Sequence, residues 1–214
     1  MREVVVRGNE RLDASFLRAL SGITPETHLL KMDVKAVERA LLTEPYVESV
    51  EVSRHFPATV SLDVKERKPV GYVCQSGRFA LVAVDGMVLE SVEQAPPALA
   101  EIRVAGMPLL VPGTRLESEG FLQVASLLSS MDESLATLVS AAGSSGGMLF
   151  LEARGIKVLY GDLSELERKN SITCLALAEL VDRYGAVEYI DVSFPDRPAI
   201  KPVAEEEGES LGVP

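Results

Sequence analysis

The sequence predicts an α+β protein, in which a small β-α-α-β-β unit precedes a mostly antiparallel β-rich part with two helices. Residues 1–69 place two amphipathic stretches between short segments rich in valine. Residues 70–203 mostly alternate apolar and polar side chains, broken by glycine-containing turns. The charge also changes near residue 69, because residues 1–69 have no net charge while the whole chain of 214 residues carries −11. We therefore expect two domains, 1–69 and 70–203, and a disordered acidic tail at 204–214.

The elements of the first unit follow from caps and periodicity. Aspartate is a preferred residue immediately before a helix, because its side chain accepts a hydrogen bond from a free backbone N–H group. Glycine and proline end helices. The expected elements are strand 4–6, helices from Asp13 to Gly22 and from Asp33 to Pro45, and strands 46–54 and 60–64 joined by a turn at 55–59.

The second part contains more strands than helices. Asp85-Gly86 is a strong hairpin signal, and Ser164 with Glu167 has the spacing of a capping box. We expect strands at 70–74, 79–84, 87–89, 102–104, 136–142, 148–153 and 156–160, a glycine- and serine-rich turn at 143–147, helices at 118–131 and from Ser164 to Gly185, and extended segments at 187–194 and 195–202.

Composition and charge exclude several classes of function. The 21 lysine and arginine residues are outnumbered by 32 acidic residues, which argues against nucleic-acid binding and against anionic membrane surfaces. No apolar run approaches the ~20 residues that span a bilayer. The two cysteines, Cys74 and Cys174, are too few for a disulfide framework or a zinc site, and we expect small core residues. A disulfide between them stays open.

The sequence gives no indication of catalysis. A nucleophile–base pair would have to use His28 or His55, and neither has a motif around it. Residues 143–147 lack the lysine and serine or threonine pair of a phosphate-binding loop. Acidic residues at 162–167 fit a helix N-terminus better than an acid/base site. We therefore expect no enzyme, no cofactor and no metal, and a protein that works through its surfaces.

The first unit resembles a POTRA domain, and the whole chain resembles the FtsQ/DivIB family of bacterial division proteins. The resemblance depends on an ordered set of segments that covers roughly residues 2–202. They are Val5-Val6-Arg7-Gly8-Asn9, Leu41–Val47, the Arg-x-Phe-Pro-x-Thr pattern of Arg54–Thr59, the Glu-Arg-x-Pro-Val pattern of Glu66–Val70, and the late strand Tyr189–Phe194.

The resemblance implies a non-enzymatic scaffold of the divisome, the assembly that forms the septum. Family members are single-pass proteins of the cell inner membrane, with this part in the periplasm or otherwise outside the cytoplasm. The chain would then be an N-terminal truncation whose Met1 is not the natural start, or a member without the anchor. The implied partners are FtsB and FtsL, with further division proteins bound through the POTRA domain. The alternative is a POTRA-type polypeptide-binding module of a transport or assembly system.

The resemblance also implies a partner-binding edge at the last strand, by addition of a partner strand. Carried over by position, its residues are Tyr189, Asp191, Phe194, Asp196, Ala199, Ile200 and Lys201. Phe194 is a candidate aromatic anchor, although alternation with Ile190 and Val192 would also allow it to face the core. Pro198 and Pro202 lack N–H groups, so any pairing here must be short.

Overall fold

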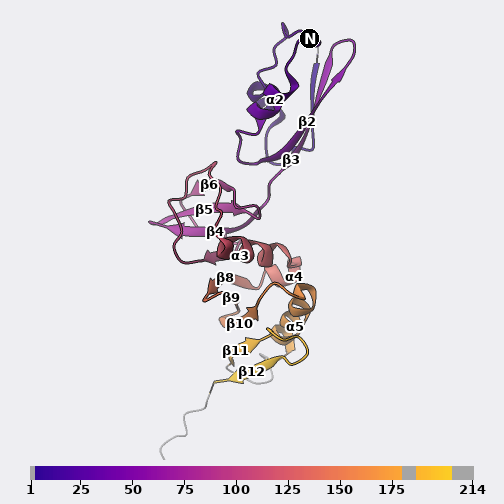
Figure 1. Cartoon of the computed structure of the whole chain (residues 1–214). Helices are drawn as coiled ribbons and strands as arrows, with labels where there is room; N and C mark the ends of the chain where they lie inside the picture. The colour runs from indigo at the N-terminus through magenta and orange to yellow at the C-terminus, as the bar shows by residue number, and fades with distance from the viewer. Residues whose placement is uncertain (1–2, 180–186, 204–214) are drawn as a thin grey trace, which may run out of the picture. The chain divides into compact units, whose positions relative to one another are not determined.

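The computed structural model describes residues 3–179 and 187–203. Tertiary contacts divide the chain into two compact units, Met1–Pro96 with Met107–Glu117, and Pro97–Gly106 with Ser118–Pro214 (Figure 1). Both contain helices and strands, so the chain is α+β as predicted. The domain boundary expected at residue 69 stays a prediction. By tertiary contacts, the strands that directly follow residue 69 group with the first unit. The acidic tail expected at 204–214 lies outside the described residues, and so does the helix end expected at Gly185.

A three-stranded sheet with two helices opens the first unit. β1 (Glu3–Arg7) pairs in parallel with β3 (Thr59–Glu66), and β2 (Val47–His55) pairs antiparallel with the other side of β3. The strand order β1-β3-β2 leaves β1 and β2 at the edges. The chain passes through α1 (Ala14–Leu20) and α2 (Val34–Leu41) between β1 and β2, in the predicted β-α-α-β-β order.

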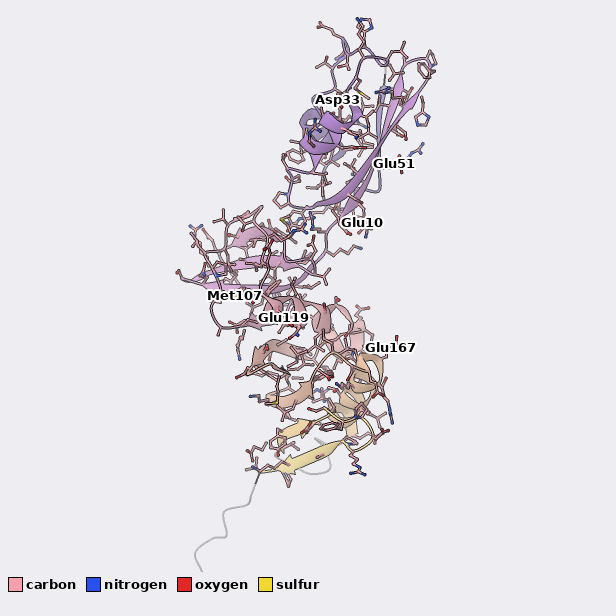
Figure 2. The ribbon with its side chains drawn as sticks, in the orientation of Figure 1. Glu10, Asp33, Glu51, Met107, Glu119 and Glu167 are labelled. Carbon is pink, nitrogen blue, oxygen red and sulfur yellow. The ribbon has the colours of Figure 1, made fainter. Side chains whose placement is uncertain are left out.

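The helix caps predicted from sequence are confirmed. The Asp13 carboxylate accepts a hydrogen bond from the Ser15 N–H group, and Asp33, labelled beside α2 in Figure 2, accepts one from Ala36. α2 ends at Leu41 rather than at Pro45, because the chain tightens into turns after that residue. The apolar faces of helices and sheet meet in one core, whose fully buried members include Leu17, Leu41, Val47, Val60 and Leu62.

Glu66 ties the end of β3 to the loop before α1. Its carboxylate accepts hydrogen bonds from the backbone N–H groups of Glu10, Arg11 and Leu12 at 3.1, 2.8 and 3.0 Å. A carboxylate that accepts several backbone N–H groups forms a charge-assisted and geometrically specific contact. The first acidic residue of the Glu-Arg-x-Pro pattern therefore serves the fold of this unit.

Arg67 ties the same end of β3 to two other segments. Its Nη1 donates to the carbonyl oxygens of Pro45 and Val47 at 2.8 and 2.6 Å, and its Nε donates to the Asp85 carboxylate at 3.0 Å. Arg67 is buried, with 9% of its surface exposed. The arginine of the pattern therefore joins the start of β2 to the turn at Asp85.

That turn belongs to an antiparallel meander of β4 (Pro69–Gln75), β5 (Arg78–Ala83) and β6 (Val88–Val92). The hairpin predicted at Asp85-Gly86 is confirmed. Gly86 adopts φ +84°, which a side chain disfavours, and its N–H group donates to the Ala83 carbonyl.

The second unit is built on a sheet with the strand order β12-β11-β10-β9-β8-β7. Neighbouring strands run antiparallel except β7 with β8 and β10 with β11. Parallel neighbours need a crossover, and α5 lies in the connection from β10 to β11. The strands are β7 (Glu101–Arg103), β8 (Val139–Ser145), β9 (Met148–Ala153), β10 (Ile156–Gly161), β11 (Val187–Asp191) and β12 (Ala199–Pro202), and the helices are α3 (Glu119–Ser129), α4 (Glu133–Ala136) and α5 (Leu166–Glu179).

Three local predictions for this unit were wrong. The strand expected from residue 136 begins at Val139, because Asp132 caps the short helix α4. The turn expected at 143–147 is shorter, since β8 continues to Ser145. The capping box does not form, because the Ser164 hydroxyl donates to the Asp162 carboxylate.

The expectation that both cysteines are core residues was also wrong. Cys74 is exposed on β4, and Cys174 is partly exposed on α5. Both are free thiols in the structure.

Candidate protein-binding edge

β12 is an edge strand. It pairs antiparallel with β11 on one side, and among residues 3–179 and 187–203 no strand pairs with its other side. An edge strand presents N–H and C=O groups to which a further strand can pair. The open edge is short, because β12 spans four residues and ends at Pro202, which has no N–H group.

The structure brings the predicted site residues together on β11, on β12 and in the turn between them. The strand register places Ala199 opposite Asp191, Ile200 opposite Ile190, and Lys201 opposite Tyr189. Residues eight to twelve positions apart in sequence therefore lie opposite each other on the two strands. Side chains alternate along a strand, so Tyr189, Asp191, Ala199 and Lys201 lie on one face of the sheet, and Ile200 lies with Ile190 on the other. Phe194 and Asp196 lie in the turn between the strands.

Phe194 points to solvent. Ile190 and Val192 are buried, at 1% and 0% exposure, whereas Phe194 is 76% exposed. The two-residue alternation breaks because β11 ends at Asp191 and the chain turns, with the Arg197 N–H group donating to the Phe194 carbonyl at 2.9 Å. The interpretation of Phe194 as a core residue is thereby excluded, and the turn that leads into β12 exposes an aromatic ring.

Lys201 and Asp191 have partners within the unit. The Lys201 ammonium lies 2.8 Å from a Glu188 carboxylate oxygen and 5.6 Å from the centre of the Tyr189 ring. The hydrogen bond to Glu188 raises the pKa of Lys201. The Asp191 carboxylate accepts a hydrogen bond from the Ser193 N–H group at 2.9 Å, so it shapes the start of the turn.

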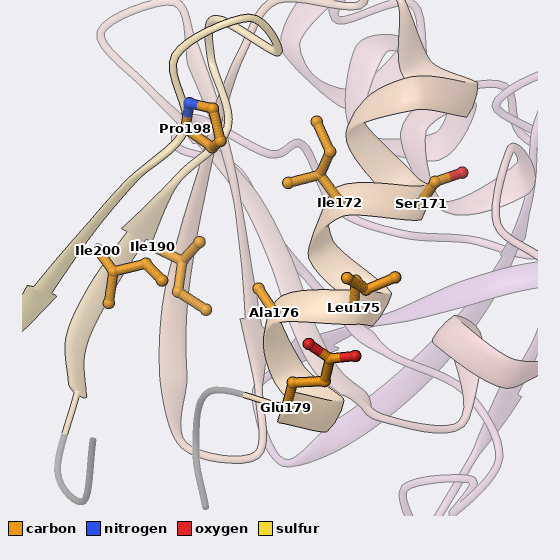
Figure 3. A pocket seen from close by; sticks show the side chains of 8 residues that line it. All are labelled: Ser171, Ile172, Leu175, Ala176, Glu179, Ile190, Pro198 and Ile200. Atoms are coloured by element: carbon orange, nitrogen blue, oxygen red, sulfur yellow. The ribbon is translucent and has the colours of Figure 1, made fainter. Parts of the chain in front are cut away.

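An apolar groove of about 390 Å³ runs between α5 and the last two strands (Figure 3). Ile190 and Ile200 line it from the strands, and Ile172 and Leu175 line it from the helix. The groove is lined by Ser171, Ile172, Leu175, Ala176, Glu179, Ile190, Pro198 and Ile200. An apolar hollow beside an open strand edge can accept side chains of an added segment.

Of the residues that line this groove, the sequence predicted only Ile200 as a partner-binding residue. The apolar face expected for the helix that begins at Ser164 contains Leu166, Thr173, Cys174 and Leu177, but neither Ile172 nor Leu175. Ile172 and Leu175 are three residues apart and lie on a second face, where Leu175 is 62% exposed. Helical spacing could have found this second apolar stripe.

A buried lysine fixes α5 to the end of β10. Lys169 is fully buried. Its Nζ donates to the carbonyl oxygens of Tyr160 and Asp162, each at 3.0 Å, and to the Asp162 carboxylate at 2.9 Å. A buried ammonium group is tolerated only where its protons are hydrogen-bonded. Sequence analysis missed Lys169, because nothing in its spacing distinguishes it from a surface lysine.

Further hydrogen bonds extend this network. The buried Tyr160 hydroxyl lies 3.0 Å from both the Asn170 amide oxygen and the Thr173 hydroxyl, and burial raises its pKa. The Asn170 amide in turn donates to the backbone and side chain of Ser130. β10, α5 and the end of α3 are therefore connected through buried polar groups.

Asp162 makes the stability of this region depend on acid. Hydrogen bonds from the Ser164 hydroxyl first, and then from the Lys169 ammonium, hold its pKa well below the ordinary 3.8. Its contribution to stability is thus fully present above pH 3.8 and is lost as the pH falls through the lower folded-state pKa. We expect Asp162→Asn to make the decline in stability on acidification shallower, as measured by urea unfolding between about pH 5 and about pH 2.

Removing the first hydrogen-bond donor provides a check on this assignment. Ser164→Ala should also make the acid dependence shallower, to a smaller extent than Asp162→Asn, because the Lys169 contact remains. Superimposable pH profiles for the wild type and Asp162→Asn would contradict the prediction.

Other candidate sites are not supported by geometry. In the described part of the chain, no three histidine, cysteine or acidic side chains are placed to hold a metal ion. Among the same residues, no helix has both the length and the apolar character needed to cross a membrane. His28 and His55 are exposed, and His55 is within hydrogen-bond distance of the Ser61 hydroxyl at 3.0 Å.

Comparison with known proteins identifies the first unit. Residues 1–67 match the family model described as the FtsQ-type POTRA domain. These residues contain the β-α-α-β-β elements and end at Arg67.

Relatives match nearly the full chain. The cell division protein DivIB of Clostridium tetani is 22% identical over 207 residues, covering 92% of this chain and 77% of the relative. The cell division protein FtsQ of Streptomyces bingchenggensis is 28% identical over 205 residues, covering 94% and 75%. The solved major extracytoplasmic domain of DivIB from Geobacillus stearothermophilus is 15% identical, with a TM-score of 0.37, and the match covers 56% of this chain and 97% of that chain. A structural similarity this low is not used to assign the fold or the function. The first unit therefore matches the FtsQ-type POTRA domain, and across both units the chain is similar to the FtsQ and DivIB cell-division proteins.

Proposed function

We propose that this protein is a non-enzymatic scaffold of the divisome, which recruits and holds other division proteins by strand addition at β12. One combination of features carries the proposal. One side of β12 is unpaired, the turn before β12 exposes the Phe194 ring, and an apolar groove lies between α5 and the last two strands. We further propose that this part lies outside the cytoplasm, held at the cell inner membrane. The expected partners are the extracytoplasmic segments of FtsB and FtsL.

The backbone limits how a partner can pair. Alternate residues of a strand direct their N–H groups to opposite sides. If the groups of Ala199 and Lys201 face outward, two donors are available, and if the other parity faces outward, Ile200 is the sole donor because Pro202 has none. So few backbone bonds cannot supply high affinity by themselves. We therefore assign most of the affinity to side chains at Phe194 and in the groove.

Hydrogen–deuterium exchange tests the docking surface directly. The whole chain would be compared alone and with the extracytoplasmic segments of FtsB and FtsL from the same organism. We expect new protection concentrated in residues 187–202. Binding with protection confined to the β1-β3-β2 sheet would instead favour the POTRA domain as the docking face, as in the alternative of a polypeptide-binding module. No binding by a folded chain would remove the scaffold mechanism.

Phe194→Ala is the sharpest single test of the anchor. Truncating a dominant aromatic contact typically costs about 2 kcal/mol or more, so we expect affinity for the partner segments to fall roughly 30-fold. The folded state should be little affected, because most of the ring is already in solvent. Isothermal titration calorimetry with circular dichroism as the folding check measures both.

Leu109→Ala is the matched control. Leu109 is 77% exposed and belongs to the first unit, whereas β12 belongs to the second. It should leave the affinity unchanged. Equal affinities for the wild type and Phe194→Ala would contradict the assignment of Phe194 as the anchor.

A further inference from the structure

The turn that carries Phe194 is fixed at its start by β10. The Val192 N–H group donates to the Leu159 carbonyl at 2.9 Å. Ser193 packs against Gly161, where a Cβ atom would lie 3.1 Å from the Ser193 Cβ and where φ is +69°. The end of β10 is itself held by Lys169. The chain therefore enters the turn at a well-defined place.

The middle of the turn has a different attachment. Phe194 makes little contact with the rest of the unit, as its exposure shows. Two residues later, an Asp196 carboxylate oxygen lies 2.6 Å from the Arg168 guanidinium. Arg168 lies in the first turn of α5 and also pairs with Glu165 at 3.3 Å. The carboxylates of Asp196 and Glu165 are thus held by one planar group on a rigid helix.

We infer that Arg168 is a positioning residue for partner binding, which acts through Asp196 to hold the turn of residues 194–197 and with it the Phe194 ring. The inference rests on the proposed docking at β12. Its physical basis is preorganisation, because a side chain already held in its bound position loses less conformational entropy on binding. Arg168 itself need not touch the partner.

The expected effect is modest. Both side chains are exposed, at 50% for Arg168 and 80% for Asp196, and exposed ion pairs contribute little. We expect Arg168→Gln to weaken partner binding about two- to fivefold and to leave the unfolding midpoint nearly unchanged. High salt should reduce the difference between variant and wild type.

Mobility of the turn can be measured without any partner. The chain contains no tryptophan, so Phe194→Trp places a single fluorescent reporter in the turn. We expect Arg168→Gln to increase the fast component of the tryptophan anisotropy decay. Arg103→Gln in the same background is the control, because Arg103 is 47% exposed and pairs with Glu101 on its own strand β7 and with Glu152 on β9. An unchanged decay in Arg168→Gln would overturn the inference.

A double-mutant cycle separates positioning from direct contact. If Arg168 acts through Asp196, then Arg168→Gln combined with Asp196→Asn should bind no more weakly than either single variant. Additive losses would overturn the inference and assign Arg168 to the interface itself. If the wild type does not bind the partner segments at all, the proposed function fails, and the anisotropy comparison still decides whether Arg168 holds the turn.

Discussion

Replacing Lys169 with methionine is expected to lower the free energy of unfolding of the second unit by about 3 kcal/mol, because each buried polar group left without a partner costs about 1–3 kcal/mol. The substitution removes the donor to the carbonyl oxygens of Tyr160 and Asp162, which remain in place on the backbone. Methionine nearly preserves the volume, so loss of packing contributes little. The Asp162 carboxylate regains water, since its side chain is 75% exposed.

Native-state hydrogen exchange on β10 and α5 measures this loss in the unit that contains the substitution. Lys157→Met is the matched control, because Lys157 is an exposed lysine on β10 whose ammonium lies over the Phe150 ring. We expect that control to change the free energy by about 0.5 kcal/mol or less. A Lys169→Met variant as stable as the wild type would show that the two carbonyl oxygens find other donors.

Arg67→Ala is expected to destabilise the first unit by a similar amount, about 3 kcal/mol. Arg67 is buried, and its loss leaves the carbonyl oxygens of Pro45 and Val47 without a donor. Arg67→Lys should lie between the alanine variant and the wild type. A lysine ammonium keeps the charge but cannot reproduce the fork of donors that reaches both carbonyl oxygens and Asp85.

Arg115→Ala provides a close control for this experiment. Arg115 donates to the same Asp85 oxygen at the same distance of 3.0 Å, but 49% of its side chain is exposed. Its loss should cost about 1 kcal/mol or less, as expected of exposed ion pairs. Exchange rates of amides in β2 and β3 report the result. Equal losses for Arg67→Ala and Arg115→Ala would show that the ion pair, and not the two buried carbonyl contacts, determines the stability.

Local signals in the sequence predicted much of the fold, where the interacting groups lie within a few residues of each other. The caps at Asp13 and Asp33 and the hairpin at Asp85-Gly86 are of this kind. The capping box at Ser164 failed for a reason that sequence spacing does not contain. The Asp162 carboxylate accepts a hydrogen bond from the Ser164 hydroxyl, and Asp162 is itself held by Lys169, seven residues further along the chain.

The candidate site divides in the same way. The order of segments at 187–202 predicted a docking edge, which stays a proposal, and the seven residues named for it lie on β11, on β12 and in the turn between them. Their surroundings could not be predicted. Phe194 was compatible with either face of a strand until the end of β11 placed it in a turn. The groove forms only because Ile172 and Leu175 of α5 lie beside Ile190 of β11 and Ile200 of β12.

The sequence of this protein was sufficient for its α+β class, the starts of α1 and α2, the resemblance to FtsQ/DivIB proteins and the position of the proposed docking edge, because all of these depend on periodicity, caps and ordered segments along the chain. The tertiary structure decided which lysine and which arginine are buried, where Phe194 points, and which helix residues face β12. These properties depend on contacts between residues far apart in sequence, such as Arg67 with Asp85 and Arg168 with Asp196. Such contacts form only when the strands and helices have packed together.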